Sequence, residues 1–468
     1  MINPASLGGP LELVGFDQQV PLVGGDSHRY VNLDYAASSP ALRRVQDAVD
    51  ALLPWYSSVH RGAGYKSQVS TAAYEGARAV VKTFFQAPPQ DAVIFTRNTT
   101  DSVNVLASSL ADGASVVAFA SEHHANLLPW QTGRLRVTYL PAPRSSTEAL
   151  ERLSGHLSGA RTDLVAITGA SNVTGEIWPV AELASLAHAH GARLLLDAAQ
   201  LAPHLPISMV RLGVDYLAAS GHKMYAPFGA GVLIGEPDWL AQSAPFLRGG
   251  GAVDFVSLDE VLWSSLPDRQ EAGSPNVVGA VAMEAAAAAL TEFGMARLGA
   301  EEIRLGEYAR AQLAALPGVQ VYRLWDAAAV RLGVVPLNVT GYEHSQIAAI
   351  LSAEYGIGVR HGCFCAHPLM LELLHTEPAA AAEIRQHLRR GQRARIPGAI
   401  RVSVGIGSTE DDIDYLTRAL RQIVEEGPSW TYRIAPDSGE YVPDPDPREW
   451  PDLPVALPRL SLSTGESS

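Results

Sequence analysis

RLLLDAAQLAPHLPISMVRLGVDYLAASGHK, residues 193–223, contains two short apolar runs that each lead into polar residues. The first run ends in Asp197, and the second, residues 214–219, leads into Ser220 and Lys223. Short continuous apolar runs of this kind are typical of strands buried on both faces of a parallel sheet. We therefore predict that the polar residues at their ends meet at one edge of such a sheet, where ligands bind in α/β proteins.

Lys223 and Asp197 together indicate a pyridoxal phosphate site. Lys223 is one of only three lysines in the chain. A lysine amine can attach an aldehyde cofactor covalently, and a carboxylate beside a pyridine nitrogen keeps that nitrogen protonated and the ring electron-poor. The tripeptide Gly221-His222-Lys223 alone is more typical of a surface turn, but Asp197 at the end of the preceding strand favours the cofactor site.

Length and composition restrict the class of protein. The chain has 468 residues, of which 47% are hydrophobic, which is enough for a large core divided among two or three domains. The first residues lack a basic segment followed by an apolar one, and Glu284 interrupts the apolar stretch from Gly279 to Leu290. We therefore expect no membrane span and a cytoplasmic location. The formal net charge of −14 argues against nucleic acid and anionic membranes as partners.

The pattern of apolar runs divides the chain into four parts. Residues 30–296 are expected to form a large α/β domain, and a long helix over residues 277–298 leads into a smaller α+β domain, residues 297–425. Residues 1–29 are expected to pack on the small domain, and the Pro- and Asp-rich residues 426–468 to form an extended tail. The strands expected in the two domains cover residues 92–96, 115–120, 164–168, 193–197, 214–219, 231–234, 319–324, 334–339, 358–360 and 400–404.

Seven segments carry a resemblance to a known family. They are NLDYAA (32–37), VHRG (59–62), TRNTT (96–100), EHHAN with PWQ (122–126 and 129–131), SNVTG (171–175), EAGSPN (271–276) and RVS (401–403). The chain resembles the class V aminotransferases of fold type I, and within them the SUF-type cysteine desulfurases and selenocysteine lyases, up to about residue 425. The resemblance implies a mostly parallel seven-stranded sheet, pyridoxal 5'-phosphate as cofactor, and a homodimer with shared active sites.

A phosphate site is expected where a strand passes into a helix at Thr99 and Thr100. Their amides and hydroxyls can hold an anion at the positive helix end, although a plain N-cap would have the same pattern. By resemblance, Ser220 and His222 are further phosphate ligands. Ser274 stands where the family supplies a threonine from the partner subunit.

The resemblance also assigns residues to the cofactor ring. His123 would lie flat on the pyridine ring and assist proton movement, while Asn172 and Gln200 would donate hydrogen bonds to the phenolic oxygen. Taken singly, a histidine pair such as His123-His124 is more often structural, and polar loop residues such as the two amides are common. Their combination with Lys223 favours the cofactor roles.

The substrate is expected to bind through its carboxylate. Arg401, on a late strand, matches the family's carboxylate anchor, a bidentate role that suits a guanidinium group, and Arg360 is the second anchor. His60, Ala37 and Asn172 complete the substrate-binding residues that the resemblance implies. Without the resemblance, an arginine on a strand is most often a solvated surface residue.

Cys365 matches the family's nucleophile. The segment RHGCFCAHP, residues 360–368, has the expected Arg-x-Gly turn before the cysteine, and Ala and Pro after it. Family members of the SUF type commonly have two histidines before that cysteine, whereas this chain has Cys363 and Phe364, as in molybdenum cofactor sulfurases. One residue between the two cysteines makes a mutual disulfide awkward. Cys363 is therefore a sulfur relay, a shield for the persulfide, or idle.

The resemblance implies conversion of L-cysteine, or L-selenocysteine, to alanine. Lys223 would remove the Cα proton, and the Cys365 thiolate would attack the substrate sulfur to form a persulfide, which passes to a sulfur-acceptor protein. Within the same fold, a transaminase, an epimerase or a C–S lyase acting on another amino acid would leave Cys365 without a catalytic role. Formation of alanine distinguishes these activities.

Two alternatives from other classes of protein, a zinc-binding protein and a non-catalytic scaffold, stay open. His361, Cys363, Cys365 and His367 alternate, so an extended strand would turn all four to one side, as in a zinc site. Four adjacent alternating ligands rarely close a tetrahedron, however, and we expect no metal. A non-catalytic scaffold is the other reading, and the presence of Lys223, Asp197, His123 and Arg401 together argues against it.

Overall fold

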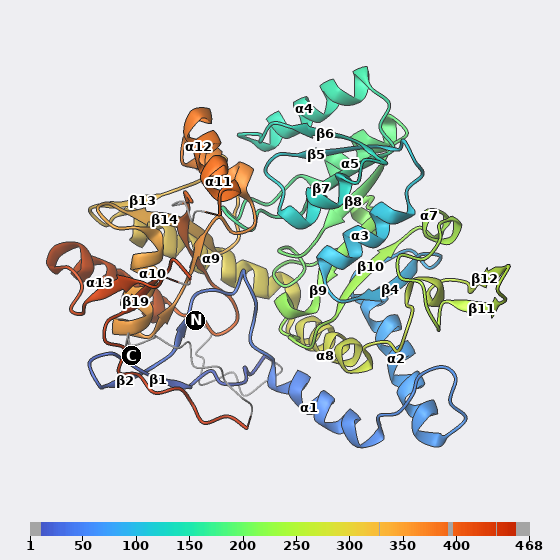
Figure 1. Cartoon of the computed structure of the whole chain (residues 1–468), viewed down its shortest axis with the longest axis horizontal. Coiled ribbons are helices and arrows are strands. Elements are labelled where there is room, and N and C mark those ends of the chain that lie inside the picture. Colours follow the sequence, from blue (N-terminus) through green and yellow to red (C-terminus); the bar gives the residue numbers. More distant parts are fainter. Residues whose placement is uncertain (1–10, 327, 392–395, 437, 455–468) are drawn as a thin grey trace.

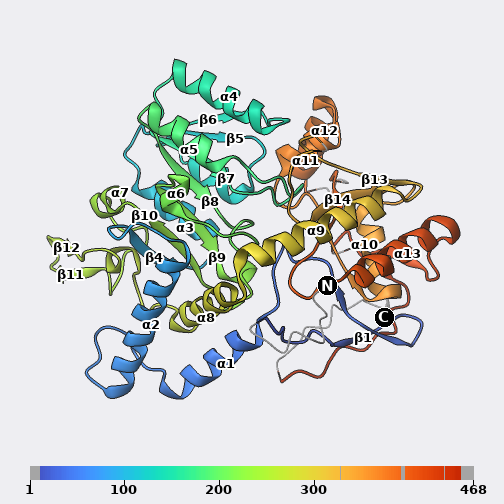
Figure 2. The ribbon, with the colours of Figure 1, turned by 180° about the vertical axis from the view of Figure 1, so that it is seen from behind.

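The computed structural model describes residues 11–326, 328–391, 396–436 and 438–454. The chain forms two lobes that are joined by helix α9 (Met295–Ala314), as Figures 1 and 2 show from opposite sides. Parts of the predicted N-terminal segment and tail, residues 1–10, 437 and 455–468, lie outside the described residues. The division into four parts remains a prediction.

The large lobe is built on a seven-stranded sheet, which confirms the predicted fold class. Its strand order is β4-β10-β9-β8-β7-β5-β6, and β10 alone runs antiparallel to its two neighbours. The strands are β4 (Ala92–Thr96), β10 (Gly231–Gly235), β9 (Tyr216–Ser220), β8 (Arg193–Asp197), β7 (Leu164–Thr168), β5 (Ser115–Phe119) and β6 (Arg136–Leu140). The two apolar runs that lead into Asp197 and Ser220 therefore form β8 and β9, which pair in parallel.

Helices cover both faces of this sheet. Leu194 and Leu196 pack in the core with α4, α5 and α8, whereas Leu195 between them packs in a separate core with α3. This alternation is the side-chain period of a strand, and both of its faces are apolar here, as expected for a sheet between two helical layers. The helices are α1 (Arg43–Leu52), α2 (Tyr65–Phe84), α3 (Thr99–Ser109), α4 (Ser146–Gly159), α5 (Val180–Ala189), α6 (Met209–Leu212), α7 (Pro237–Gln242) and α8 (Val277–Phe293).

The small lobe has a four-stranded antiparallel sheet in the order β13-β14-β17-β16 and its own apolar core. Its strands are β13 (Val319–Val321), β14 (Val334–Val339), β17 (Ala399–Ser403) and β16 (Arg360–Gly362). Its helices are α9, α10 (His344–Tyr355), α11 (His367–Leu373), α12 (Pro378–Arg389) and α13 (Glu410–Glu426). Arg401 and Arg360 are direct partners across β17 and β16, so the sheet pairing brings the two predicted anchors together.

The expected single helix over residues 277–298 is wrong. The chain bends by 82° between α8 and α9. Gly294 lies at the break with a φ of +97°, a conformation that a residue with a side chain rarely adopts. Among the described residues no single helix is long and apolar enough to cross a membrane, although the bent pair α8 and α9 reaches that length and composition.

Both ends of the described chain contact the small lobe. Strand β3 (Val31–Asn32) pairs in parallel with β15 (Ile357–Gly358), and β1 (Gln19–Pro21) pairs with β2 (Ser27–Arg29) just before it. The tail is not simply extended as predicted, because β18 (Tyr432–Ile434) and β19 (Tyr441–Pro443) form a hairpin against α10. The Tyr432 hydroxyl fixes it by donating a 2.8 Å hydrogen bond to Glu354.

Candidate active site

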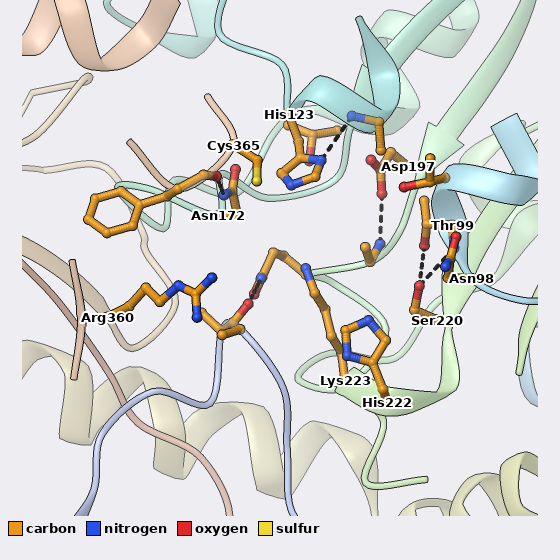
Figure 3. Close-up of a pocket in the computed structure, with 18 of the residues that line it drawn as sticks. Asn98, Thr99, His123, Asn172, Asp197, Ser220, His222, Lys223, Arg360 and Cys365 are labelled. Atoms are coloured by element: carbon orange, nitrogen blue, oxygen red, sulfur yellow. Dashed lines mark hydrogen bonds between the residues drawn. The ribbon is translucent and has the colours of Figure 1, made fainter. Parts of the chain in front are cut away.

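The predicted site residues surround a cavity of about 230 Å³ between the two lobes. The carboxyl ends of β8 and β9, the start of α3, the loop after β5 and the small-lobe residues around Cys365 and Arg401 all contribute (Figure 3). The predicted residues that line the cavity are Ala37, Thr99, Thr100, His123, Asn172, Asp197, Gln200, Ser220, His222, Lys223, Arg360, Cys365 and Arg401.

Lys223 and Asp197, which the sequence predicts to act together, both line the cavity. Asp197 is the last residue of β8 and is buried, with Oδ1 accepting a 2.9 Å hydrogen bond from the Ala199 amide. Burial raises the pKa of Asp197, against the opposing effects of that amide and of Lys223. Burial also lowers the pKa of Lys223 to about 8, although the carboxylate of Asp197 acts in the other direction. A substantial fraction of the Lys223 amine is therefore neutral near pH 7.5, as a nucleophile or base must be.

The start of α3 offers donors to an anion. The Thr99 amide donates a 2.8 Å hydrogen bond to Ser220 Oγ, and the two hydroxyls of Thr99 and Ser220 are also 2.8 Å apart. A Cβ on Gly231 would lie 2.5 Å from the Asn98 Cα, so only glycine lets β10 approach this turn so closely. Because α3 begins at Thr99 and both Thr99 and Thr100 line the cavity, a phosphate fits at this positive helix end.

The two histidines of the cavity are neutral at physiological pH. Burial lowers the pKa of His123 to about 3 and that of His222 to about 4, and the nearby Lys223 acts in the same direction on both. His123 Nδ1 accepts a 3.0 Å hydrogen bond from the Ala125 amide, which places the ring proton on Nε2. A neutral imidazole can lie against an electron-poor ring without the repulsion that an imidazolium would bring.

The two predicted amide donors make main-chain contacts. Gln200 Nε2 donates to the Ala36 carbonyl at 2.6 Å, and Asn172 Nδ2 donates to the Phe364 carbonyl at 2.8 Å. Each NH₂ group has a second hydrogen for another acceptor. Gln200 Oε1 is buried and has no hydrogen-bond partner among the described residues. Such a group calls for a partner that the described residues do not supply.

Taken together, the donor set fits pyridoxal phosphate. The buried carboxylate suits the ring nitrogen of that molecule, and the lysine of lowered pKa suits its aldehyde. The neutral histidine suits the ring face, and the helix start with two hydroxyls suits the phosphate. The predicted roles of the individual residues remain proposals.

Arg401 is buried on β17 and holds two contacts across the cavity. Its guanidinium donates to the Asn172 carbonyl at 2.9 Å and to Asp34 Oδ1 at 3.2 Å, and it lies 5.0 Å from the centre of the Phe364 ring. Arg401 Nε has no partner among the described residues. Arg360 on the neighbouring strand is exposed, and its charge adds to the lowering of the Arg401 pKa that burial causes. Two adjacent guanidinium groups make this wall attractive to a carboxylate.

Cys365 lies in a tight turn at the cavity rim. The Ala366 amide donates to the Cys363 carbonyl at 2.9 Å, and both central residues, Phe364 and Cys365, have a φ of +54°. This is the pattern of a type I′ turn, which normally takes Asn and Gly. Cys365 is exposed, whereas Cys363 is half-buried and burial raises the pKa of its thiol.

Two predicted residues lie outside this cavity. His60 and Ser274 line a separate cavity of about 400 Å³ in the same chain, where the His60 ring is 2.9 Å from Glu75. The described residues contain no group of three or more His, Cys, Asp or Glu that could hold a metal ion. His361 stacks on His344 and His367 stacks on His124, so the alternating residues do not converge as the zinc alternative requires.

Three residues of the site were not among the site residues predicted from the sequence. Asp34 lies within the quoted segment 32–37 and binds Arg401, and Asn98 is the N-cap of α3, accepting from the Asp101 amide at 3.0 Å. The N-cap preference for asparagine is a signal that could have identified Asn98. Phe364 carries no such signal, because its contact with Arg401 arises only from the turn conformation.

Comparison with known proteins agrees with this geometry. The family model described as aminotransferase class-V matches residues 31–416. A probable cysteine desulfurase of Halalkalibacterium halodurans is 37% identical over 406 residues, covering 84% of this chain and 93% of the relative. A cysteine desulfurase of Klebsiella pneumoniae strain 342 is 35% identical over 378 residues, covering 79% and 86%.

Solved structures give the same result. A cysteine desulfurase from Thermococcus onnurineus NA1 superposes with a TM-score of 0.73 at 30% identity, covering 85% of this chain and 95% of that one. The S-sulfonic acid form of the cysteine desulfurase CsdA from Escherichia coli superposes with a TM-score of 0.72 at 30% identity, covering 91% and 99%.

Proposed function

This chain belongs to the aminotransferase class-V family, and we propose that it is a pyridoxal phosphate-dependent cysteine desulfurase. It converts L-cysteine to L-alanine and transfers the sulfur to Cys365, from which an acceptor takes it. The observation that carries the proposal is one cavity bordered by Lys223, Asp197, Arg401 and an exposed cysteine. The family implies the cofactor, and the names of the relatives favour cysteine over other amino acids.

Each residue of the cavity has a separate role in the proposed reaction. When bound, pyridoxal phosphate supplies an electron-poor ring that accepts the electron pair of the substrate Cα–H bond. Lys223 holds the cofactor by its amine and, once released, removes the Cα proton; Asp197 keeps the ring nitrogen protonated. Arg401 binds the substrate carboxylate and so orients the Cα–H bond and the sulfur.

Sulfur transfer then requires a thiolate. Cys365 Sγ attacks the substrate sulfur, so an S–S bond forms while the substrate Cβ–S bond breaks and its electron pair stays with carbon. The carbon skeleton regains its Cα proton, gains one at Cβ and leaves as alanine. Cys365 is left as a persulfide whose outer sulfur an acceptor thiolate can attack.

The experiment that tests this function combines a spectrum with product analysis. The purified protein should show an absorbance band near about 420 nm, as a lysine-bound aldehyde cofactor gives. Addition of L-cysteine with a reductant should release alanine and sulfide in equal amounts. A band without alanine would instead favour a transaminase, an epimerase or a lyase acting on another amino acid. L-selenocysteine in the same assay decides which of the two substrates is preferred.

Capture of the cofactor should depend on pH through Lys223. Only the neutral amine attacks an aldehyde, and its pKa is lowered from an ordinary 10.5 to about 8. We expect the rate of cofactor capture by cofactor-free protein to rise with pH up to about 8 and then level off. Mixing with pyridoxal phosphate at a series of pH values and following the band measures this. A rate that keeps rising to pH 10 would show an unperturbed lysine and contradict the buried setting.

Arg401→Lys should impair substrate binding more than turnover. Lysine keeps the positive charge but cannot make a bidentate contact with the substrate carboxylate. One charge-assisted hydrogen bond contributes about 1.5–3 kcal/mol to binding. We therefore expect KM for L-cysteine to rise about 10- to 100-fold. Arg360→Lys, on the exposed neighbouring position, is the matched control and should change KM much less. Equal effects of the two substitutions would contradict Arg401 as the principal anchor.

We further propose a homodimer in the cytoplasm, with a small sulfur-acceptor protein as partner and neither nucleic acid nor membrane. The hairpin of β11 (Val253–Val256) and β12 (Val261–Trp263) exposes apolar side chains, with Leu258 at its tip fully exposed. The cavity that holds His60 and Ser274 adjoins this hairpin, because Arg61 donates to the Val253 carbonyl at 3.3 Å. Covering that face with a second subunit accounts for Ser274 as a residue of a shared site.

A further inference from the structure

The cysteine turn is held in place from the opposite lobe. Non-glycine residues with positive φ are strained and persist only where the surroundings fix them. Phe364 and Cys365 are two such residues in succession. Their carbonyls are both bound by the large lobe, that of Phe364 by Asn172 Nδ2 at 2.8 Å and that of Cys365 by the His124 amide at 2.7 Å.

His124 also binds the chain just beyond the turn. Its Nε2 accepts a 3.2 Å hydrogen bond from the His367 amide and also lies 3.2 Å from His367 Nδ1. The two imidazole rings stack with centres 5.1 Å apart and planes 11° apart. His367 is the first residue of α11, and the preceding N-cap, Ala366, has no side chain that could accept this bond. His124 therefore takes the place of the missing cap.

The same short segment orients His123. The Ala125 amide donates to His123 Nδ1, and residues 124–126 form one turn of 3₁₀ helix. Consecutive residues of the large lobe thus face the two reacting parts of the cavity, His123 toward the cofactor site and His124 toward the turn that carries Cys365. A shift of this segment would move both together.

We propose that His124 is a positioning residue for sulfur transfer, which holds the Cys365 turn in register with the substrate by capping α11 from the opposite lobe. The inference rests on the proposed desulfurase function. The capping bond needs a free electron pair on Nε2 of His124. Burial lowers the pKa of His124, with a smaller effect of His367, so the ring is neutral and the pair is free at physiological pH.

Three variants of the cofactor-loaded protein test the role. His124→Gln places an amide oxygen near the position of Nε2, and His124→Asn carries the same group on a side chain too short to reach. His367→Ala removes the ring stack and the Nδ1 contact to His124 but keeps the amide donor. One readout is the rate of alanine formation in a single turnover. The other is the rate at which iodoacetamide alkylates Cys365, followed by intact mass with Cys365→Ser as background. The absorbance band and the melting temperature report cofactor binding and folding.

We expect His124→Asn to slow single-turnover alanine formation by about 10- to 100-fold, because a misplacement of about 1 Å between reacting groups can lower a rate by about 100-fold. Alkylation of Cys365 should become faster in this variant, while the band and the KM stay near those of the unchanged protein. His124→Gln and His367→Ala should behave nearly as the unchanged protein. If His124→Asn does not fold, His124→Ser, whose hydroxyl is also too short to reach the His367 amide, takes its place and is judged by the same two readouts.

Two results would overturn the role. Unchanged rates in His124→Asn would show that the side chain does not hold the turn. Equal impairment of His124→Gln, or of His367→Ala, with His124→Asn would show that the capping bond is not what matters. Failure of the desulfurase function is seen separately, because the unchanged protein would then form no alanine while the order of alkylation rates still reports on the turn.

Discussion

Lys223→Ala is expected to abolish both the absorbance band and the formation of alanine. The substitution removes the amine that attaches the cofactor and the base that takes the Cα proton, and general base catalysis alone contributes about 100- to 10,000-fold. We expect the rate of alanine formation to fall on the order of 1,000-fold or more. The proposed phosphate donors Thr99 and Ser220 remain, so we expect the cofactor still to bind, but without a covalent bond. Dialysis of the variant should therefore release it.

The chain offers a matched control for this experiment. Lys66 is exposed on α2, away from the cavity, and is one of the only two other lysines. Lys66→Ala should keep the band and the activity of the unchanged protein. Reduction with borohydride before digestion should place the cofactor on the peptide that contains Lys223. A label on Lys66 or Lys82, or a band that persists in Lys223→Ala, would contradict the assignment.

The sequence predicted the parts of the site that depend on strand ends. Asp197 and Ser220 were placed correctly because short apolar runs reveal parallel strands, and parallel strands bring their carboxyl ends to one edge. Arg401 was placed through the family resemblance, and its pairing with Arg360 follows from strand register. The sequence pattern could not indicate that Gln200 and Asn172 donate to main-chain carbonyls, because those bonds depend on loop conformations.

The errors have physical causes as well. The stretch 277–298 has no helix-breaking proline, so the sharp bend at Gly294 could not be distinguished from a glycine tolerated within a helix. The tail hairpin is stabilised by contacts with α10, such as Tyr432 with Glu354, rather than by its own composition. His60 and Ser274 remain predictions, because the family resemblance places Ser274 in a site shared with the partner subunit and a single chain does not test that.

Cys365→Ser should separate cofactor chemistry from sulfur transfer. A serine hydroxyl is not ionised at neutral pH and cannot form a persulfide, so we expect alanine formation to fall on the order of 1,000-fold or more, as removal of a catalytic nucleophile does elsewhere. The absorbance band should stay, and L-cysteine should still change the spectrum, because Lys223, Asp197 and Arg401 are untouched. Measurement of alanine and of the spectrum on one sample distinguishes the two stages.

Cys363→Ser is the control that makes this result specific. Cys363 is half-buried and burial raises the pKa of its thiol, so it stays protonated and weakly nucleophilic, whereas Cys365 is exposed at the cavity rim. We expect Cys363→Ser to keep single-turnover alanine formation. If Cys363→Ser loses activity as Cys365→Ser does, the first sulfur acceptor is not Cys365 alone. If both single variants keep it, the double variant Cys363→Ser/Cys365→Ser decides, because alanine formed without either cysteine would show a lyase rather than a desulfurase.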